Sequence, residues 1–177
     1  MDLFEAIEKR RSIRKYKQAP VKSGDLRKIL EAARLAPSGG NRQPWSFVVV
    51  KEPETKKALS IASDDQEWIS DADVVVVALG DPAVYSLPPS SSQGRHKQDT
   101  MIAVEHLVLA ATALGYGTCW IGAFKEDEVK RILRIPEKLA VVALLPIGLP
   151  DEDPPAKPRK HLSEAFFRET YGVPFEP

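Results

Sequence analysis

The amino end of the chain carries four basic side chains in the stretch RRSIRKY, residues 10–16. In an extended backbone, alternate side chains point to the same side, so Arg10, Ser12 and Arg14 converge while Lys15 points into solvent. Two guanidinium groups and a hydroxyl on one face suit a phosphate monoester. A solvated charged turn is the alternative, and for an isolated basic cluster it is the more common one.

A second stretch with binding chemistry is PSGGNRQPW, residues 37–45. Its paired glycines allow the backbone to approach a ligand closely. Asn41 and Gln43 offer amide donors and acceptors that can read the edge of a heterocycle. Taken alone, however, this stretch is also typical of an ordinary helix-to-strand turn.

Several other chemistries find no support in the residues. The chain contains no G-x-G-x-x-G, no G-x-x-x-x-G-K-[ST] and no G-x-S-x-G motif. His96, His106 and His161 lack metal-ligand spacing, and His106 is expected as a core or interface histidine. The single Cys119 excludes an internal disulfide and is expected to be a small buried side chain. We therefore assign no metal site and no catalytic side chain, and an enzyme of this kind would rely on a cofactor.

Composition narrows the class of protein. The 177 residues fit one domain, covering residues 1–177, and 25 basic side chains balance 25 acidic ones. This balance argues against a nucleic-acid partner. Charged residues near the amino end do not resemble a signal peptide, and the apolar runs are too short to span a bilayer. A soluble, cytoplasmic protein with no membrane association is expected.

Two helices are expected before the loop at 37–44. Asp2 caps the first, which fades near Arg10. Its core-facing positions are Leu3, Phe4 and Ile7. Ser23 caps the second, and Pro37 ends it. The apolar stripe of this second helix comprises Leu26, Ile29, Leu30 and Ala33.

The remainder of the chain alternates strands and helices. The expected strands are residues 45–51, 74–79 and 139–148. Helices are expected after Pro53 and at 99–114, about 125–134 and about 162–171. Residues 81–98 are expected to form a loop or lid, and residues 149–177 a C-terminal extension. Because near-continuous apolar strands are separated by helices, the pattern predicts an α/β or α+β sandwich with a helix-covered sheet.

The helix at 99–114 is apolar on nearly all of its faces. Such a helix must be buried on several sides. In a domain of this size, a subunit interface is one ready explanation.

The combination of these stretches resembles the nitroreductase family of FMN-dependent oxidoreductases. The matching segments are RRSIRKY (10–16), APSGGNRQPWSFVVV (36–50), LAATALGYGTCWIGAF (109–124) and PAKPRKHLSE (155–164). The resemblance implies an α+β fold with a central, mostly antiparallel sheet flanked by helices. It also implies a homodimer that forms through the long central helix and binds two FMN molecules at its interface.

The resemblance also assigns residues to the cofactor. The family segment that holds the FMN phosphate and part of the isoalloxazine ring matches Arg10, Arg11, Ser12 and Arg14. Arg159 matches the tail cation on the phosphate, and Lys157 assists it. The loop that the partner subunit places against the flavin matches Pro37, Ser38, Gly39 and Asn41, with Gln43 as a further ring contact. Ile121 and Gly122 match the loop that passes the pyrimidine edge of the flavin with its backbone groups.

The implied reaction is a two-step, ping-pong transfer. Hydride passes from NADH or NADPH to flavin N5, and a nitroaromatic, quinone or similar acceptor then takes the electrons. Arg14, near the N1/O2 edge, would act electrostatically on the reduced flavin. The sequence departs from larger family members because only residues 81–98 replace an inserted helical region, so a more open pocket is expected. We assign no site residue to the acidic segment 64–73.

Two alternatives stay open. The chain could bind or handle flavin without nicotinamide turnover. Alternatively, the chain could be a helix-covered α/β domain that binds an unrelated phosphorylated metabolite or polyanion.

Overall fold

A four-stranded sheet forms the centre of the computed structural model, which describes residues 1–85 and 94–175. The strands are β1 (Trp45–Val50), β2 (Val74–Gly80), β3 (Gly117–Thr118) and β4 (Ala140–Gly148). They lie in the order β1-β2-β4-β3, and each neighbouring pair is antiparallel. This pairing selects the α+β class over α/β, because parallel strands would require crossover helices between sheet neighbours.

Strands β1, β2 and β4 agree closely with the three strands expected from the sequence, and helices connect and cover them. The helices are α1 (Leu3–Lys9), α2 (Ser23–Arg34), α3 (Pro53–Ala62), α4 (Trp68–Asp71), α6 (Arg95–Ala113), α7 (Glu126–Leu133) and α8 (Leu162–Ala165). Two short 3₁₀ turns are η1 (Gly39–Asn41) and η2 (Pro82–Val84). None of the helices in the described part of the chain has both the length and the hydropathy needed to cross a membrane.

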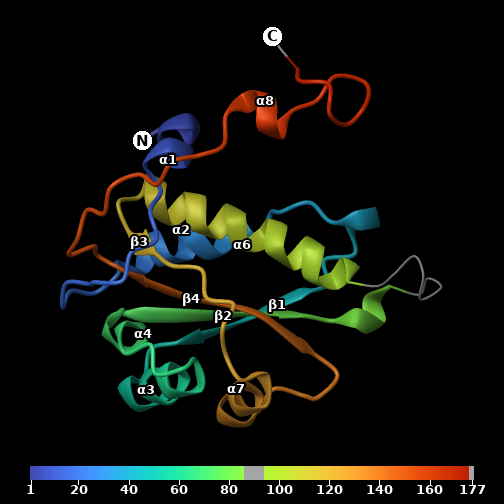
Figure 1. Cartoon of the computed structure of the whole chain (residues 1–177). Coiled ribbons are helices and arrows are strands. Elements are labelled where there is room, and N and C mark those ends of the chain that lie inside the picture. The colour runs from blue at the N-terminus through green and yellow to red at the C-terminus, as the bar shows by residue number, and fades with distance from the viewer. Residues whose placement is uncertain (86–93, 176–177) are drawn as a thin grey trace.

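Strand β2 is buried along its whole length and divides its side chains between two cores. Val74 and Val76 pack with α2 and α6 on one face of the sheet, whereas Val75 and Val77 pack with α3 and α7 on the other. Figure 1 shows these two helical layers, with α2 and α6 on one side of the strands and α3, α4 and α7 on the other. The period of two along the strand thus produces a three-layer sandwich.

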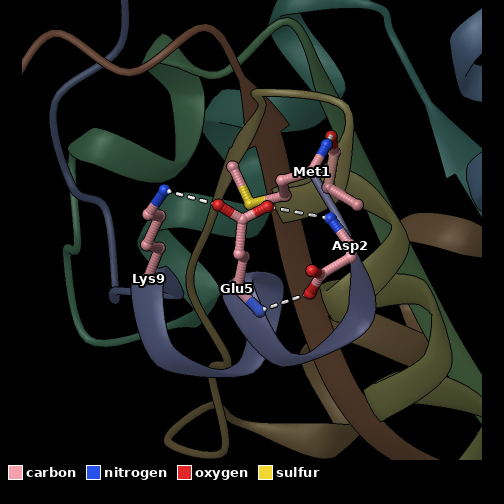
Figure 2. Close-up of polar contacts among 5 residues, drawn as sticks. Met1, Asp2, Glu5 and Lys9 are labelled. Carbon is pink, nitrogen blue, oxygen red and sulfur yellow. Dashed lines mark hydrogen bonds and ion pairs between the residues drawn. The ribbon is translucent and has the colours of Figure 1, made fainter.

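Helix α1 begins with the expected cap at Asp2, which forms a complete capping box (Figure 2). The Asp2 carboxylate accepts from the backbone N–H of Glu5 at 2.9 Å, and the Asp2 N–H donates to the Glu5 carboxylate at 3.0 Å. Lys9 donates to the other oxygen of Glu5 at 3.2 Å. Two N–H groups that lack partners inside the helix are therefore satisfied by side chains of the helix itself.

The expected core face of α1 is wrong for the single chain. Leu3, Phe4 and Ile7 are 60%, 80% and 53% exposed, and Ala6 is the side chain that the fold buries. The small side chain of Ala6 lets α1 lie close against α6, and the larger apolar side chains then face outward. The stripe of α2, by contrast, is confirmed, because Leu26, Ile29 and Ala33 are buried.

Three helix boundaries differ from expectation. Ser23 is the first residue of α2, and Lys22 occupies the cap position without a side-chain hydrogen bond. Helix α6 begins at Arg95, four residues before the expected start, because Gly94 supplies a left-handed turn (φ 77°) immediately before it. Of the expected lid, residues 95–98 are therefore helical, and residues 86–93 lie outside the described residues. Helix α8 ends at Ala165, well before residue 171.

Candidate functional site

The segment 10–16 runs in extended form beside the short strand β3. Ser12 forms a parallel bridge with Thr118, and the Ile13 N–H donates to the Thr118 carbonyl at 2.9 Å. Ile13 is buried, so the neighbouring side chains of Ser12 and Arg14 point away from the core, as the alternation predicts. A Cβ atom at Gly117 would lie only 2.8 Å from Ile13. Glycine at 117 is therefore what allows this segment to approach the sheet.

The tail after β4 returns to the same segment. The Lys17 N–H donates to the Leu149 carbonyl, and the Asp151 N–H donates to the Lys15 carbonyl, each at 2.9 Å. The Glu152 carboxylate accepts from the backbone N–H of Arg14 at 2.5 Å. These contacts bring together two segments that are about 138 positions apart in the chain.

A basic pocket forms where the segment and the tail meet, and we call it the arginine pocket. It has a volume of about 160 Å³. Its lining comprises Arg10, Arg11, Ser12, Arg14, Pro154, Pro155, Lys157 and Arg159. The predicted phosphate residues from both ends of the chain are thus placed together by the fold.

The guanidinium groups of the arginine pocket form no salt bridge within the described residues, and the nearby Glu152 carboxylate is bonded to backbone N–H groups instead. Two of the guanidinium groups donate to backbone carbonyls: Arg11 to Glu8 and Arg10 at 2.6 and 2.9 Å, and Arg159 to Lys157 and Pro158 at 3.0 and 3.4 Å. Guanidinium groups without a carboxylate partner, beside a hydroxyl, are the donor set that a phosphate dianion requires, so the residues fit the phosphate of FMN.

The segment 64–73, in which the sequence predicted no site residue, lies against Arg14 and against the segment that contains Gly122. Trp68 of α4 lies beneath the Arg14 guanidinium. Gln66 donates to the carbonyls of Ser63 and Ala123, at 2.8 and 3.4 Å. The one signal in the sequence was a tryptophan within an otherwise acidic stretch.

The segment 119–123 offers fewer free groups than its sequence suggests. The backbone N–H and carbonyl of Ile121 are both bonded to Leu144, at 3.0 and 3.1 Å. Gly122 is exposed, and a Cβ atom there would meet nothing within 4 Å. Burial raises the pKa of the Cys119 thiol, which agrees with its expected role as a small core side chain. Gly122 is therefore the position here with open space for a ligand.

The loop at 37–43 is closed by its own hydrogen bonds. The Ser38 hydroxyl accepts from the Gln43 N–H at 2.9 Å, and the Ser38 carbonyl accepts from the Asn41 N–H at 2.9 Å. The Gln43 side chain donates to the Asn41 carbonyl at 3.0 Å. Pro37 and Asn41 are exposed, and within residues 1–85 and 94–175 no group is hydrogen-bonded to the Asn41 side-chain amide. The loop thus presents that amide to its surroundings.

Sheet topology separates this loop from the arginine pocket. The loop enters β1, whose first residue, Trp45, pairs with Gly80 at the end of β2. The pocket lies beside β3, whose Gly117 pairs with Gly148, adjacent to the start of β2 at Val74. β1 and β3 are opposite edges of the sheet, and the length of β2 adds a separation of ~20 Å along the strands. Within one chain, the two predicted halves of the site do not meet.

An apolar groove of about 530 Å³ runs between α1, the end of α2 and α6. Its lining comprises Met1, Asp2, Leu3, Ala6, Ala32, Leu35, His106, Leu109, Ala110 and Ala113. Helix α6 is buried toward the sheet, but Met101 and Ile102 on its other side are 43% and 41% exposed. The expectation that α6 is buried on several sides is confirmed, because the helix packs against the sheet, α2 and α1, and the face of Met101 and Ile102 stays exposed in the single chain.

Comparison with known proteins gives matches along most of the chain. The model of the "Nitroreductase family" matches residues 7–83 and 62–149. A protein named NADH dehydrogenase from Thermus thermophilus is 35% identical, with 86% of this chain and 89% of the relative covered. The crystal structure of a nitroreductase family protein from Clostridium novyi is 36% identical, with a TM-score of 0.82 and coverage of 99% and 97%. The NADPH:FMN oxidoreductase of Vibrio harveyi, solved in complex with NAD⁺, is 25% identical, with a TM-score of 0.87 and coverage of 96% and 77%.

Proposed function

The chain belongs to the nitroreductase family of NAD(P)H- and FMN-dependent oxidoreductases, and from this premise we propose the reaction that it catalyses. Hydride passes from NADH or NADPH through FMN to a nitroaromatic, a quinone or a similar acceptor, in a two-step, ping-pong cycle. The observation that carries the proposal is the arginine pocket, where Arg10, Ser12 and Arg14 meet Arg159 from the far end of the chain. FMN, when bound, supplies the hydride chemistry that no side chain of this chain offers.

The functional unit is a homodimer with FMN at the interface. The arginine pocket and the loop 37–41 lie at opposite ends of the sheet in one chain, so a second copy is needed to bring them to one cofactor. The apolar groove beside α6 and the outward face of α1 supply the surface for this contact. Further exposed apolar side chains in the tail are Leu162, Phe166, Tyr171, Val173 and Phe175. An exposed apolar groove of this size is characteristic of an interface.

Each predicted residue then has a physical task. Arg10, Ser12 and Arg159 hold the phosphate, and Arg14 places a positive charge near the ring. Arg11 is bonded to the carbonyls of Glu8 and Arg10, and it supports the shape of the segment. Asn41 from the partner loop offers its free amide to the ring edge. No side chain is required as an acid or a base.

The purified protein tests this proposal directly. It should be yellow, run as a dimer on size exclusion with light scattering, and release about one FMN per chain on denaturation. Anaerobic mixing with NADH or NADPH in a stopped-flow instrument should bleach the flavin absorbance, and an acceptor panel should restore it. Initial rates against both substrates should give parallel double-reciprocal lines.

Two results would contradict the proposal in different ways. A colourless protein that takes up no added FMN would overturn flavin binding altogether. A yellow protein that neither nicotinamide bleaches would favour the alternative, a flavin-binding or flavin-handling protein without nicotinamide turnover.

A further inference from the structure

One carboxylate oxygen reaches from α6 to the loop 37–41. Oδ2 of Asp99 accepts a hydrogen bond from the backbone N–H of Gly39 at 3.0 Å. The same oxygen accepts from the hydroxyl of Tyr85, whose side chain is buried. Gly39 and Asp99 are 60 positions apart, so this contact joins the loop to the long helix rather than to its own neighbours.

The other side of Gly39 is held by Arg42. Its guanidinium donates to the Gly39 carbonyl at 3.2 Å and lies over the Tyr85 ring, 5.5 Å from the ring centre. Both polar backbone groups of Gly39 are therefore bonded within the chain, and neither points to a ligand. We call Arg42, Tyr85 and Asp99 the Gly39 clamp.

The backbone of this loop explains why a clamp is useful. Gly40 and Asn41 have φ values of 59° and 55°, and Gln43 has 48°. Side chains other than glycine rarely adopt this left-handed region, and such a conformation persists only where surrounding contacts determine it. The clamp fixes the residue immediately before this turn. It thereby sets the direction in which the Asn41 side chain leaves the loop.

We propose that Tyr85 and Asp99 are positioning residues for FMN, acting through Gly39 on the loop that one subunit places against the cofactor of its partner. This inference rests on the proposed function. The clamp holds the loop in its bound shape before the cofactor arrives, so the ordering cost does not fall on FMN binding. Oδ2 of Asp99 and the Tyr85 hydroxyl are engaged with Gly39 and with each other, so in this proposal they act on the cofactor through the loop and not by direct contact.

The test measures FMN release from the intact holoenzyme. Dilution to nanomolar concentration is followed by the rise in flavin fluorescence, which gives the release rate and the Kd. Asp99→Ala should weaken FMN binding roughly tenfold, the effect of losing a charged hydrogen bond. Asp99→Asn keeps one oxygen that can accept both bonds and should recover most of the affinity. Asp127→Ala, an equal charge change on the exposed face of α7, should release FMN like the unmodified chain.

A second variant keeps the test independent of folding. Tyr85→Phe retains the ring beneath Arg42 and removes only the hydroxyl, and it should raise the Kd about threefold. Combining it with Asp99→Ala should add nothing further, because both act through one oxygen. The melting temperature of each variant is measured alongside, since a merely structural role would lower it without changing FMN release.

The outcomes separate the clamp from the proposed function. An unmodified chain that holds FMN, with Tyr85→Phe and Asp99→Ala releasing it no faster, would overturn the clamp and leave the proposed function standing. Faster release with recovery by Asp99→Asn would support it. An unmodified chain that binds no FMN would overturn both.

Discussion

The guanidinium of Arg14 lies over the ring of Trp68, 5.7 Å from its centre. This contact connects the basic segment 10–16 with α4, a part of the chain that carries no recognisable motif. A cation over an aromatic face is attracted by the ring quadrupole, so Trp68 restricts where the positive charge of Arg14 can lie. The contact makes α4 a part of the arginine pocket's surroundings.

Replacing Trp68 with leucine should loosen Arg14 and weaken FMN binding. A cation–π contact of this kind contributes ~0.5–1 kcal/mol, so the Kd should rise about two- to fivefold. Trp68→Phe keeps an aromatic face and should show the smaller change. Fluorescence titration with FMN measures both. Equal affinities for the leucine variant and the unmodified chain would show that Trp68 does not restrain Arg14.

Removing the charge of Arg14 should lower the reduction potential of the bound flavin. A nearby positive charge favours the reduced, more negative form, and its loss should lower the midpoint by about 30 mV, equivalent to ~1.4 kcal/mol for two electrons. Arg14→Ala is compared with Arg14→Lys, which keeps the charge, and with Lys15→Ala, which removes an exposed charge outside the pocket. An Arg14→Ala midpoint equal to that of the unmodified protein would count against this role.

Selectivity for the phosphate should depend on Arg10. A hydrogen bond to a charged group contributes ~1.5–3 kcal/mol, so Arg10→Ala should weaken FMN binding about 10- to 150-fold. Riboflavin lacks the phosphate, and its affinity should be the same for Arg10→Ala and the unmodified chain. Calorimetric titration with both ligands makes the comparison, with Lys15→Ala as the control for charge. A parallel loss of riboflavin affinity would mean that Arg10 supports the ring or the fold instead.

The capping box of α1 should stabilise the fold. Asp2→Ala removes the acceptor for the Glu5 N–H, and the loss of an N-cap side chain costs ~1 kcal/mol. For a chain of this size, the melting temperature should fall by about 2–4 °C. Asp2→Asn retains an acceptor and should restore most of the difference. An unchanged melting temperature for Asp2→Ala would show that α1 is held by its packing on α6 alone.

Lowering the pH should weaken the capping box of α1, because Glu5 becomes protonated. The backbone N–H of Asp2, and then Lys9, lower the pKa of the Glu5 carboxyl below its ordinary value of 4.5. Because the pKa is lower in the folded state, the contribution to stability is present above pH ~4.5 and is lost as the pH falls through the folded pKa. The stability advantage of the unmodified chain over Glu5→Gln should therefore shrink between pH 6 and pH 3 in urea titrations. An advantage that is constant with pH would contradict this linkage.

Local patterns in the sequence were sufficient for much of the fold. The apolar runs at 74–79 and 139–148 predicted β2 and β4, and Asp2 predicted the start of α1. The alternation in RRSIRKY predicted that Arg10, Ser12 and Arg14 share one face, and all three line the arginine pocket. These predictions succeeded because strand period and helix capping involve atoms only a few residues apart.

Other features involve partners that no local pattern contains. The outward face of α1 depends on how closely Ala6 lets that helix approach α6, and the clamp on Gly39 depends on a carboxylate 60 positions away. Trp68 reached Arg14 only through the packing of α4 beside the segment 10–16. The sequence of α4 alone could not indicate that neighbour.

The sequence by itself thus determined which residues can bind a phosphate and a heterocycle, because that capacity is a property of side-chain chemistry and short-range spacing. Only the tertiary structure decided how those residues are distributed. Strand order and register place Arg159 beside Arg10 and move the loop of Asn41 to the opposite edge and end of the sheet. Long-range pairing is fixed by the packing of the whole sandwich, and it keeps the two halves of the proposed site apart within one chain, which is why we propose a homodimer.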